Sequence, residues 1–398
     1  MTVEATIPPG KQEASNSSWM NDPKVRGYIY QVITVLVLAI AVTWITLNTI
    51  ENLRRANIAS GYGFLNGRAG FDLGQSLIAY TSDSTYGRAL VVGFMNTLLV
   101  AITGIITATI VGFLVGIGRL SHNWLIAKLC MVYVEVFRNI PPLLVIFFWY
   151  SGVLAVLPQP RESLHLPFDM FLNNRGLAFP RPVFDSGAQF IFYALVIGIV
   201  ISFLVGRYAH KRQMETGQRF PLLWTVLGLV IGLPLIAYFV TGMPVSFDIP
   251  VAGKFNLTGG SVVGPEFLSL FLALSFYTAA FIAEIVRAGI RGVSKGQSEA
   301  AHALGVRPGL TTRLVVVPQA MRIIIPPLTS QYLNLTKNSS LAVAVGFADV
   351  MAVGGTMLNQ TGQAVEIVAI WVVIYLSISV TTAVFMNWFN ARMALVER

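Results

Sequence analysis

The stretch SKGQSEAAHALGVRPGLTTRLVVVP, residues 294–318, is the longest polar interruption in the apolar second half of the chain. It predicts a short helix outside the membrane, because Ser294 and Gln297 fit a capping box and alanines follow them. Gly305 is placed to end this helix in a left-handed conformation, and the Pro-Gly pair that begins at Pro308 predicts a turn. A helix of about three turns is marginal alone in water, so we expect it to pack against something.

The composition is that of an integral membrane protein. The chain has 398 residues, of which 55% are apolar and 11% charged, whereas soluble domains average about 25% charged. The apolar runs reach helical length, which favours helices over a barrel. The single cysteine, Cys130, excludes a disulfide framework, and the four scattered histidines lack metal-ligand spacing, so we expect no metal site.

Eight apolar runs are long enough to cross a bilayer as helices. They are residues 28–47, 89–116, 139–157, 188–206, 222–241, 266–286, 323–346 and 367–387. We therefore predict an all-α polytopic membrane protein with about eight transmembrane helices. The first run continues past Ala39-Ile40-Ala41, which favours a spanning anchor over a cleaved signal. Gly112 and Gly116 form a small-xxx-small pair suited to close helix packing.

The distribution of Lys and Arg predicts the orientation. With the N-terminus in the cytoplasm, the inside segments carry 18 of these residues and the outside loops carry 7. The inside segments are then 1–27, 119–138, 207–221, 287–322 and 388–398, and the outside loops are 48–87, 158–187, 242–265 and 347–366. Both termini and the 294–318 stretch are therefore expected in the cytoplasm. Topology explains the net charge of +9, so nucleic-acid binding is not expected.

The 294–318 stretch resembles the EAA loop of permease subunits of ATP-binding-cassette (ABC) importers. The family pattern is EAA, three residues, Gly, nine residues and Ile-x-Leu-Pro; the spacing is intact here, with valine at the Ile and Leu positions. In that family the loop forms a coupling helix that docks on a cytoplasmic ATPase. Carried over by position, the coupling residues are Glu299, Ala300, Ala301, Gly305 and Pro318. The alternative is an ordinary surface helix between two spans.

Three further stretches resemble the polar amino-acid permease branch of this family. They are YVEVFRNIPP at 133–142, SFYTAAFIAEIVR at 275–287 and IPPLTSQYLNLTKNSSLA at 325–342. The resemblance covers roughly 89–157 and 266–387 and implies a type I importer core of five helices. The size of the chain resembles the larger permease subunits of general L-amino-acid importers.

The resemblance divides the chain into a core and additions. We expect a cytoplasmic segment 1–27, an extra span with its outside loop at 28–87, the transmembrane domain at 88–387, and a cytoplasmic tail at 388–398. An insertion of about 158–265 within the domain carries two extra spans.

Two charged pairs stand three residues apart at cytoplasmic ends of spans, Glu135 with Arg138 and Glu284 with Arg287. Such residues are neighbours on one helix face. One interpretation is local pairing, with the arginines reaching to the interface. The other is contact between helices that changes during gating.

Lys337 lies near the middle of a predicted span, where a charge costs at least about 2.5–3.5 kcal/mol. Its polar neighbours are Asn334, Thr336, Asn338, Ser339 and Ser340. One hypothesis is that Lys337, Asn334, Asn338, Ser339 and Ser340 line the substrate path, with the ammonium attracting a substrate carboxylate. The other is that Lys337 pairs with a carboxylate such as Glu284 and only fixes helix packing.

Four other polar residues are expected to be structural or solvated. Asn96 and Thr97 are predicted to be hydrogen-bond partners between helices. Asp349 and Glu366 stand near span ends, where water is expected to reach them.

The chain has no phosphate loop of the form G-x-x-x-x-G-K-[ST] and no hydrolase motif, so we expect no catalytic residue and no bound cofactor. The resemblance implies ATP and Mg on a cytoplasmic ATPase dimer, a second permease subunit, and a periplasmic solute-binding protein that delivers an amino acid. We expect a multi-pass protein of the bacterial inner membrane, in contact with lipid, that works by alternating access. The alternative is a secondary transporter driven by an ion gradient.

Overall fold

The computed structural model describes residues 23–55, 61–218, 220–253 and 256–393, and most of them are helical. The helices are α1 (Pro23–Arg55), α2 (Tyr86–Gly118), α3 (Trp124–Arg138), α4 (Pro142–Phe147), α5 (Ala188–Thr216), α6 (Leu222–Leu227), α7 (Leu233–Val240), α8 (Pro265–Arg291), α9 (Lys295–Ala303), α10 (Pro308–Thr311), α11 (Val317–Asn338), α12 (Val350–Thr361) and α13 (Ala364–Met393). Short 3₁₀ or π segments are η2 (Tyr62–Asn66), η3 (Phe148–Leu154), η4 (Pro160–Glu162), η5 (Gly228–Gly232), η6 (Thr312–Val316) and η7 (Ser339–Val345).

The predicted membrane spans correspond to long apolar helices and bent helix pairs. Within the described ranges, six helices are long and apolar enough to cross a membrane, and two bent pairs bring the number to as many as eight. One bent pair joins α3 to α4 and η3 at 110°, and the other joins the segment from α10 to η7 with α12 at 51°. Most of residues 119–138, which were predicted as an inside segment, forms the helix α3, which was not among the predicted spans. Its charged residues interrupt the apolar run without ending the helix.

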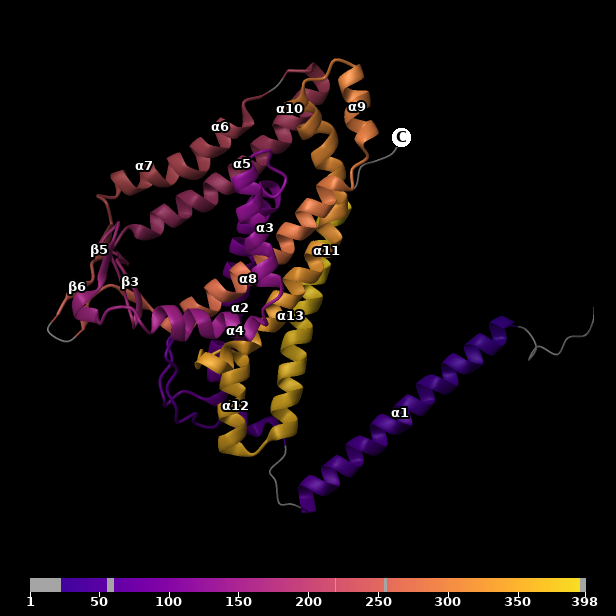
Figure 1. Cartoon of the computed structure of the whole chain (residues 1–398). Coiled ribbons are helices and arrows are strands. Elements are labelled where there is room, and N and C mark those ends of the chain that lie inside the picture. The colour runs from indigo at the N-terminus through magenta and orange to yellow at the C-terminus, as the bar shows by residue number, and fades with distance from the viewer. Residues whose placement is uncertain (1–22, 56–60, 219, 254–255, 394–398) are drawn as a thin grey trace, which may run out of the picture.

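The core forms where α2 and α8 pack closely, with α4, α11 and η7 around them (Figure 1). The predicted small-residue pair is confirmed at this contact. A Cβ atom added to Gly112 would lie 2.6 Å from the Cβ of Ile282, and one added to Gly116 would lie 2.7 Å from the carbonyl oxygen of Ala283. Only glycine therefore permits this separation of the two helices.

A second apolar cluster lies at the opposite end of the molecule from α9, between α2, α12, α13 and the loop that contains η2 (Figure 1). Asp349 caps α12 by accepting a hydrogen bond from the backbone N–H of Ala352 at 2.8 Å. Glu366 accepts one from the backbone N–H of Gly61 at 2.6 Å. The expectation that water reaches these carboxylates is wrong, because both residues are buried where the chain folds back over the helix ends.

The predicted hydrogen bonding between helices is confirmed for Thr97, whereas the partners of Asn96 lie in loops. The Asn96 amide donates to the carbonyl oxygens of Gln75 and Ala348, at 3.0 and 2.9 Å. The Thr97 hydroxyl accepts from the backbone N–H of Val350 at 3.1 Å. The two side chains thus tie α2 to the start of α12.

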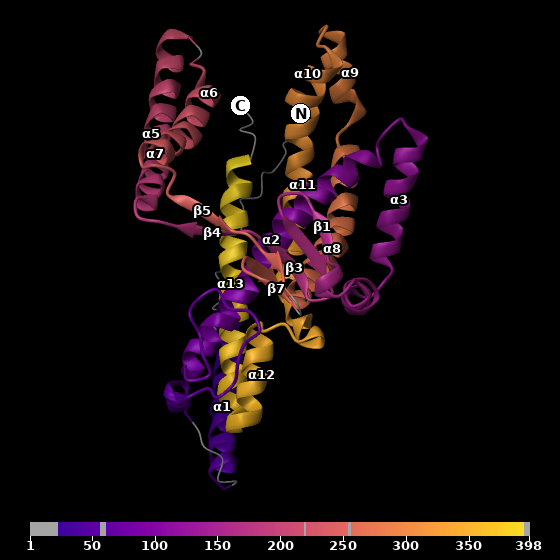
Figure 2. The ribbon, with the colours of Figure 1, turned by 90° about the vertical axis from the view of Figure 1, so that its left-hand side faces the viewer.

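The segment that was predicted as an insertion, about 158–265, contains short strands, which the sequence did not predict. They are β1 (Leu164–Leu166), β2 (Met170–Asn173), β3 (Gly176–Phe179), β4 (Arg181–Phe184), β5 (Val245–Asp248), β6 (Val251–Ala252), β7 (Leu257–Thr258) and β8 (Ser261–Val263). An antiparallel sheet has the order β1-β2-β3-β8, while β4 pairs with β5 and β6 with β7. The β4–β5 ribbon leads to a hairpin of α5 with α6, η5 and α7, which stands apart from the core helices in Figure 2.

Candidate functional site

The helix predicted at 294–304 is α9, at one end of the molecule beside α10 (Figure 1). The C-terminal end of α9 is as predicted, with Gly305 in a left-handed conformation. Gly305 has a φ of +75°, its N–H donates to the carbonyl of His302, and the N–H of Val306 donates to the carbonyl of Ala301. This hydrogen-bond pattern is a Schellman motif, which needs a left-handed residue at the position of Gly305.

The start of α9 and the following turn differ from the expectation. Ser294 precedes the helix, but its side chain makes no capping hydrogen bond, so the predicted capping box is wrong. Gln297 instead accepts a hydrogen bond from the side-chain amide of Gln319 at 3.2 Å, which ties α9 to α11. Pro308 begins α10 rather than a turn, because proline is well suited to the first position of a helix.

The coupling residues carried over from the family differ in their exposure to solvent. Ala301 is buried against the chain, whereas Glu299 and Ala300 are exposed. Glu299 also lines a cavity of about 480 Å³ between α9 and the end of α8. Pro318 lies in the first turn of α11 and is half-buried.

Beside Gly305, the structure exposes apolar side chains that the motif does not name. Leu304 is 83% exposed, and Leu310 and Leu314 are exposed on the next helical segment. Exposed apolar groups at a polar end of a protein are typical of contact surfaces. A leucine that ends an otherwise polar helix is the signal in the sequence that marks this surface.

The predicted charged residues meet at the ends of α2, α3 and α8. Glu284 accepts hydrogen bonds from the guanidinium groups of Arg119 and Arg287, and Arg138 lies 4.0 Å from the same carboxylate. Arg119 also lies 3.8 Å from Glu135. Glu284 and Arg287 pair as expected, but Glu135 and Arg138 pair with other helices rather than with each other. We call these five residues the charge cluster.

Sequence spacing alone did not predict Arg119 as the link between the helices. It caps the C-terminal end of α2, and its side chain is only 10% exposed. The Tyr133 hydroxyl adds a hydrogen bond of 2.6 Å to the carbonyl of Phe276, so α3 is held to α8 at two levels.

Lys337 lies on the exposed face of α11 and does not contact a carboxylate of the described residues. The pairing with Glu284 is wrong, because that carboxylate is engaged by arginines, and within the described part of the chain Lys337 has no ion pair. Ser330, Asn334 and Lys337 are exposed at helical spacing and form a polar stripe on α11. Asn338 and Ser340 are half-buried beside it, whereas Ser339 is fully buried and donates to the carbonyl of Thr336.

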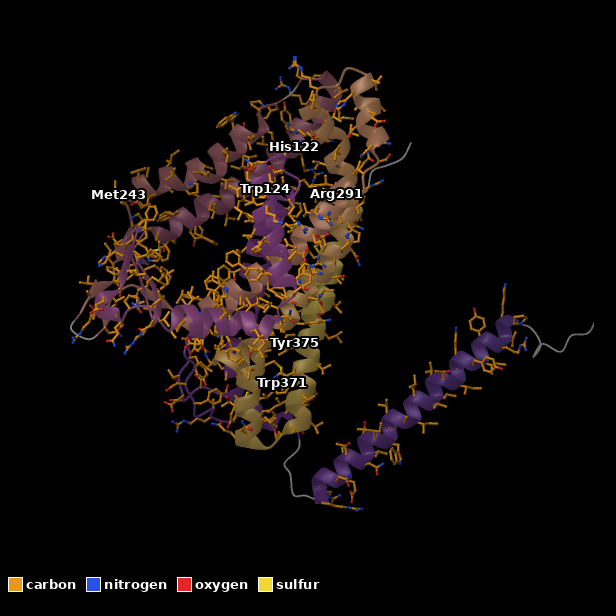
Figure 3. All side chains as sticks on the ribbon, in the orientation of Figure 1. His122, Trp124, Met243, Arg291, Trp371 and Tyr375 are labelled. Atoms are coloured by element: carbon orange, nitrogen blue, oxygen red, sulfur yellow. The ribbon has the colours of Figure 1, made fainter. Side chains whose placement is uncertain are left out.

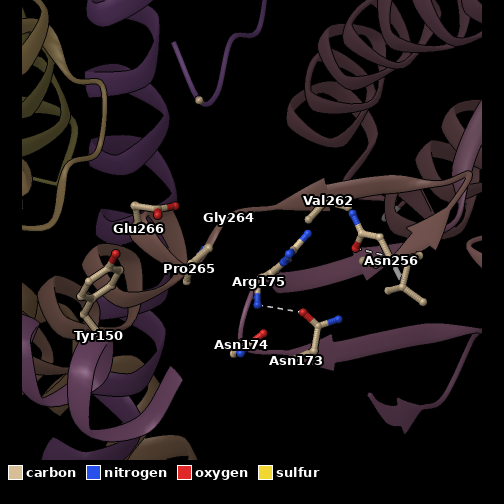
Figure 4. A pocket seen from close by; sticks show the side chains of 12 residues that line it. Tyr150, Asn173, Asn174, Arg175, Asn256, Val262, Gly264, Pro265 and Glu266 are labelled. Carbon is tan, nitrogen blue, oxygen red and sulfur yellow. Dashed lines mark hydrogen bonds between the residues drawn. The ribbon is translucent and has the colours of Figure 1, made fainter. Parts of the chain in front are cut away.

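A cavity of about 570 Å³ lies where the sheet β1-β2-β3-β8 meets the start of α8 (Figure 4). Arg175 enters it from the turn between β2 and β3, and Glu266 from the first turn of α8. Tyr150 of η3 also lines the cavity, and the buried Oδ1 of Asn174 has no partner among the described residues. This cavity could not be predicted from the sequence, since its walls come from distant parts of the chain.

Known proteins resemble this chain along its whole length. A general L-amino acid transport system permease protein of Rhizobium johnstonii is 69% identical over 400 residues, covering 100% of both chains. A putative amino-acid ABC transporter permease protein of Escherichia coli is 48% identical, covering 95% of this chain and 96% of that one. A glutamate/glutamine/aspartate/asparagine transport system permease protein of Rhodobacter capsulatus is 40% identical with the same coverage.

A family profile matches residues 194–395, about half of the chain, and its description is "Binding-protein-dependent transport system inner membrane component". The matched region contains α8, α9, α11 and α13, and so includes Gly305 and the polar stripe. With its full-length relatives and this match, the chain belongs to the family of inner membrane components of binding-protein-dependent transport systems.

Proposed function

We propose that this chain is the permease subunit of an ATP-driven importer of L-amino acids with broad specificity. The observation that carries this proposal is full-length similarity to a permease of a general L-amino acid transport system. The protein would span the bacterial inner membrane with both termini in the cytoplasm. ATP and Mg would be bound by a dimeric ATPase, and a periplasmic solute-binding protein would deliver the substrate.

The α9 end of the molecule is the proposed docking surface for the ATPase. Glu299, Ala300 and Leu304 are exposed there, and Gly305 fixes the direction in which the chain leaves α9. ATP can shift the permease only as far as its two states differ in their docking free energy. Because α9 is tied to α8 through the short connection 292–294 and to α11 through Gln297, a displacement of α9 moves two core helices.

The polar stripe of α11 is the proposed lining of the substrate path. In lipid, Lys337 would remain without a partner at a cost of at least about 2.5–3.5 kcal/mol. A second permease subunit facing this stripe would enclose it in a water-filled path, and the ammonium group would attract a substrate carboxylate. Asn334 and Ser340 supply neutral hydrogen-bonding groups one turn away on either side.

The experiment that tests coupling replaces Gly305 with valine. An added Cβ meets no atom within 4 Å, so the effect is conformational: a left-handed non-glycine residue costs about 1–2 kcal/mol. We expect normal membrane insertion, with ATPase co-purification and uptake lowered about 5- to 30-fold. Gly305→Asn is the matched control and should stay near wild type, since asparagine tolerates this conformation.

Normal ATPase binding and uptake in Gly305→Val would overturn the assignment of α9. The substrate class is tested separately, with the purified complex and a panel of acidic, basic, polar and apolar amino acids. Uptake that follows an ion gradient and resists vanadate would instead favour a secondary transporter.

A further inference from the structure

A basic cavity of about 440 Å³ opens at the end of the molecule that carries α9, between α2, α3 and α8. Four of the seven residues that line it are cationic, and none is acidic: Arg119, Lys128, Arg287 and Arg291. The other three are Trp124, Ala127 and Met131, which share one face of α3. The cavity therefore combines a cationic floor with an apolar wall.

The nearby carboxylates do not neutralise this charge. Glu284 is shared by Arg119, Arg138 and Arg287, and the ion pair of Glu135 among the described residues is with Arg119. Lys128 and Arg291 are exposed, and the described residues include no ion-pair partner for either. These two cations, from α3 and from the last turn of α8, are thus available to an anion from outside the chain.

An apolar surface continues from the cavity along α3. Leu125, Leu129, Val132 and Val136 are all exposed and, at helical spacing, form one stripe about a third of a turn from the cavity face. Trp124 is 74% exposed at the start of α3, near the loop that carries His122 (Figure 3). Tryptophan at the end of a membrane helix is typical of the headgroup level of the bilayer.

We propose that this cavity binds the phosphate headgroup of an anionic phospholipid, with the acyl chains lying along the apolar stripe of α3. A basic pocket between membrane helices on the cytoplasmic side suits such headgroups. The apolar stripe favours a lipid over a soluble anion or an acidic protein segment, neither of which would cover it. The bound lipid would hold α3 to α2 and α8 beside the charge cluster, and this site does not depend on which substrate is carried.

The test uses the purified, delipidated permease in complex with its ATPase. Phosphatidylglycerol, phosphatidylcholine or inorganic phosphate is added, and bound lipid is counted by native mass spectrometry alongside the melting temperature. We expect phosphatidylglycerol alone to bind and to raise the melting temperature. The double variant Lys128→Gln/Arg291→Gln should bind it about 10- to 30-fold more weakly.

The matched control is Lys211→Gln/Arg212→Gln, which removes the same charge from the end of α5, away from the cavity. It should bind phosphatidylglycerol as the wild type does. Ala127→Phe is a second test variant that fills the cavity without changing its charge, and it should also lose the lipid.

Three outcomes would overturn the proposal. The first is undiminished phosphatidylglycerol binding in both cavity variants. The second is equal binding of phosphatidylcholine, which would mean that the headgroup charge is not recognised. The third is equal stabilisation by inorganic phosphate, which would indicate a site for a free anion.

Discussion

Glu284 connects the ends of three helices through ion pairs. Its carboxylate is shared by Arg119, Arg287 and Arg138, which come from α2, α8 and α3. The sequence predicted the Arg287 contact, because three residues along a helix bring two side chains together. It could not predict Arg119, which is more than 160 residues away along the chain. Spacing identifies partners within a helix, whereas contacts between helices depend on how they pack.

We predict that Glu284→Gln destabilises this end of the protein. The amide keeps the shape but loses the charge, and each charge-assisted hydrogen bond lost is worth about 1.5–3 kcal/mol. Arg119 would then stay mostly buried without a full counter-charge. The melting temperature of the purified complex should fall, and proteolysis of the 119–123 loop should become faster.

The control for this prediction is Glu215→Gln, which removes an exposed carboxylate paired with Lys211 on α5. Exposed pairs of this kind contribute about 0–1 kcal/mol, so this variant should melt as the wild type does. Equal melting temperatures for the Glu284 variant and the wild type would contradict the structural role of the cluster.

At the scale of elements, long apolar helices were predicted well and short or interrupted elements poorly. Helical spans need many consecutive apolar residues, which the sequence displays directly. The strands of the insertion have two to four residues each, too few for an alternating pattern to be recognised. α3 was missed for a different reason: its charged residues face the cluster and the cavity, and they interrupt the hydropathy run.

The α2–α8 contact gives a prediction at this scale. Gly112→Ala should destabilise the protein by about 1–3 kcal/mol, because its Cβ would lie 2.6 Å from two atoms of Ile282 and the helices would have to separate. Gly206→Ala in α5 is the matched control, since its Cβ meets nothing within 4 Å. That variant should be neutral or slightly stabilising. A loss of stability in both variants would show that helix packing is not the cause.

At the scale of the whole molecule, the single chain leaves a polar face of a membrane helix uncovered. Lys337 and its polar neighbours are recognisable in the sequence, but the sequence does not show which of them the fold leaves exposed. The structure places Lys337 and Asn334 on the exposed side and Ser339 inside. The remaining wall of the proposed path would belong to a second permease subunit.

We predict that Lys337→Met lowers amino-acid uptake about 10-fold or more, the size of one lost charge-assisted contact. Co-purification of the ATPase should be unchanged, because Lys337 is remote from α9. Lys337→Arg keeps the charge and should retain more activity, while Lys211→Met on α5 should have no effect. Undiminished uptake by the methionine variant would remove Lys337 from the proposed path.

The β4–β5 ribbon brings the two ends of the α5–α7 hairpin together. Arg181 and Asp248 are directly paired across the ribbon, so the chain leaves for the α5–α7 hairpin and returns at neighbouring points. Paired strands lie about 5 Å apart, a gap that a tight turn can close. A single insertion or deletion in the gene could therefore add or remove the hairpin without displacing the core.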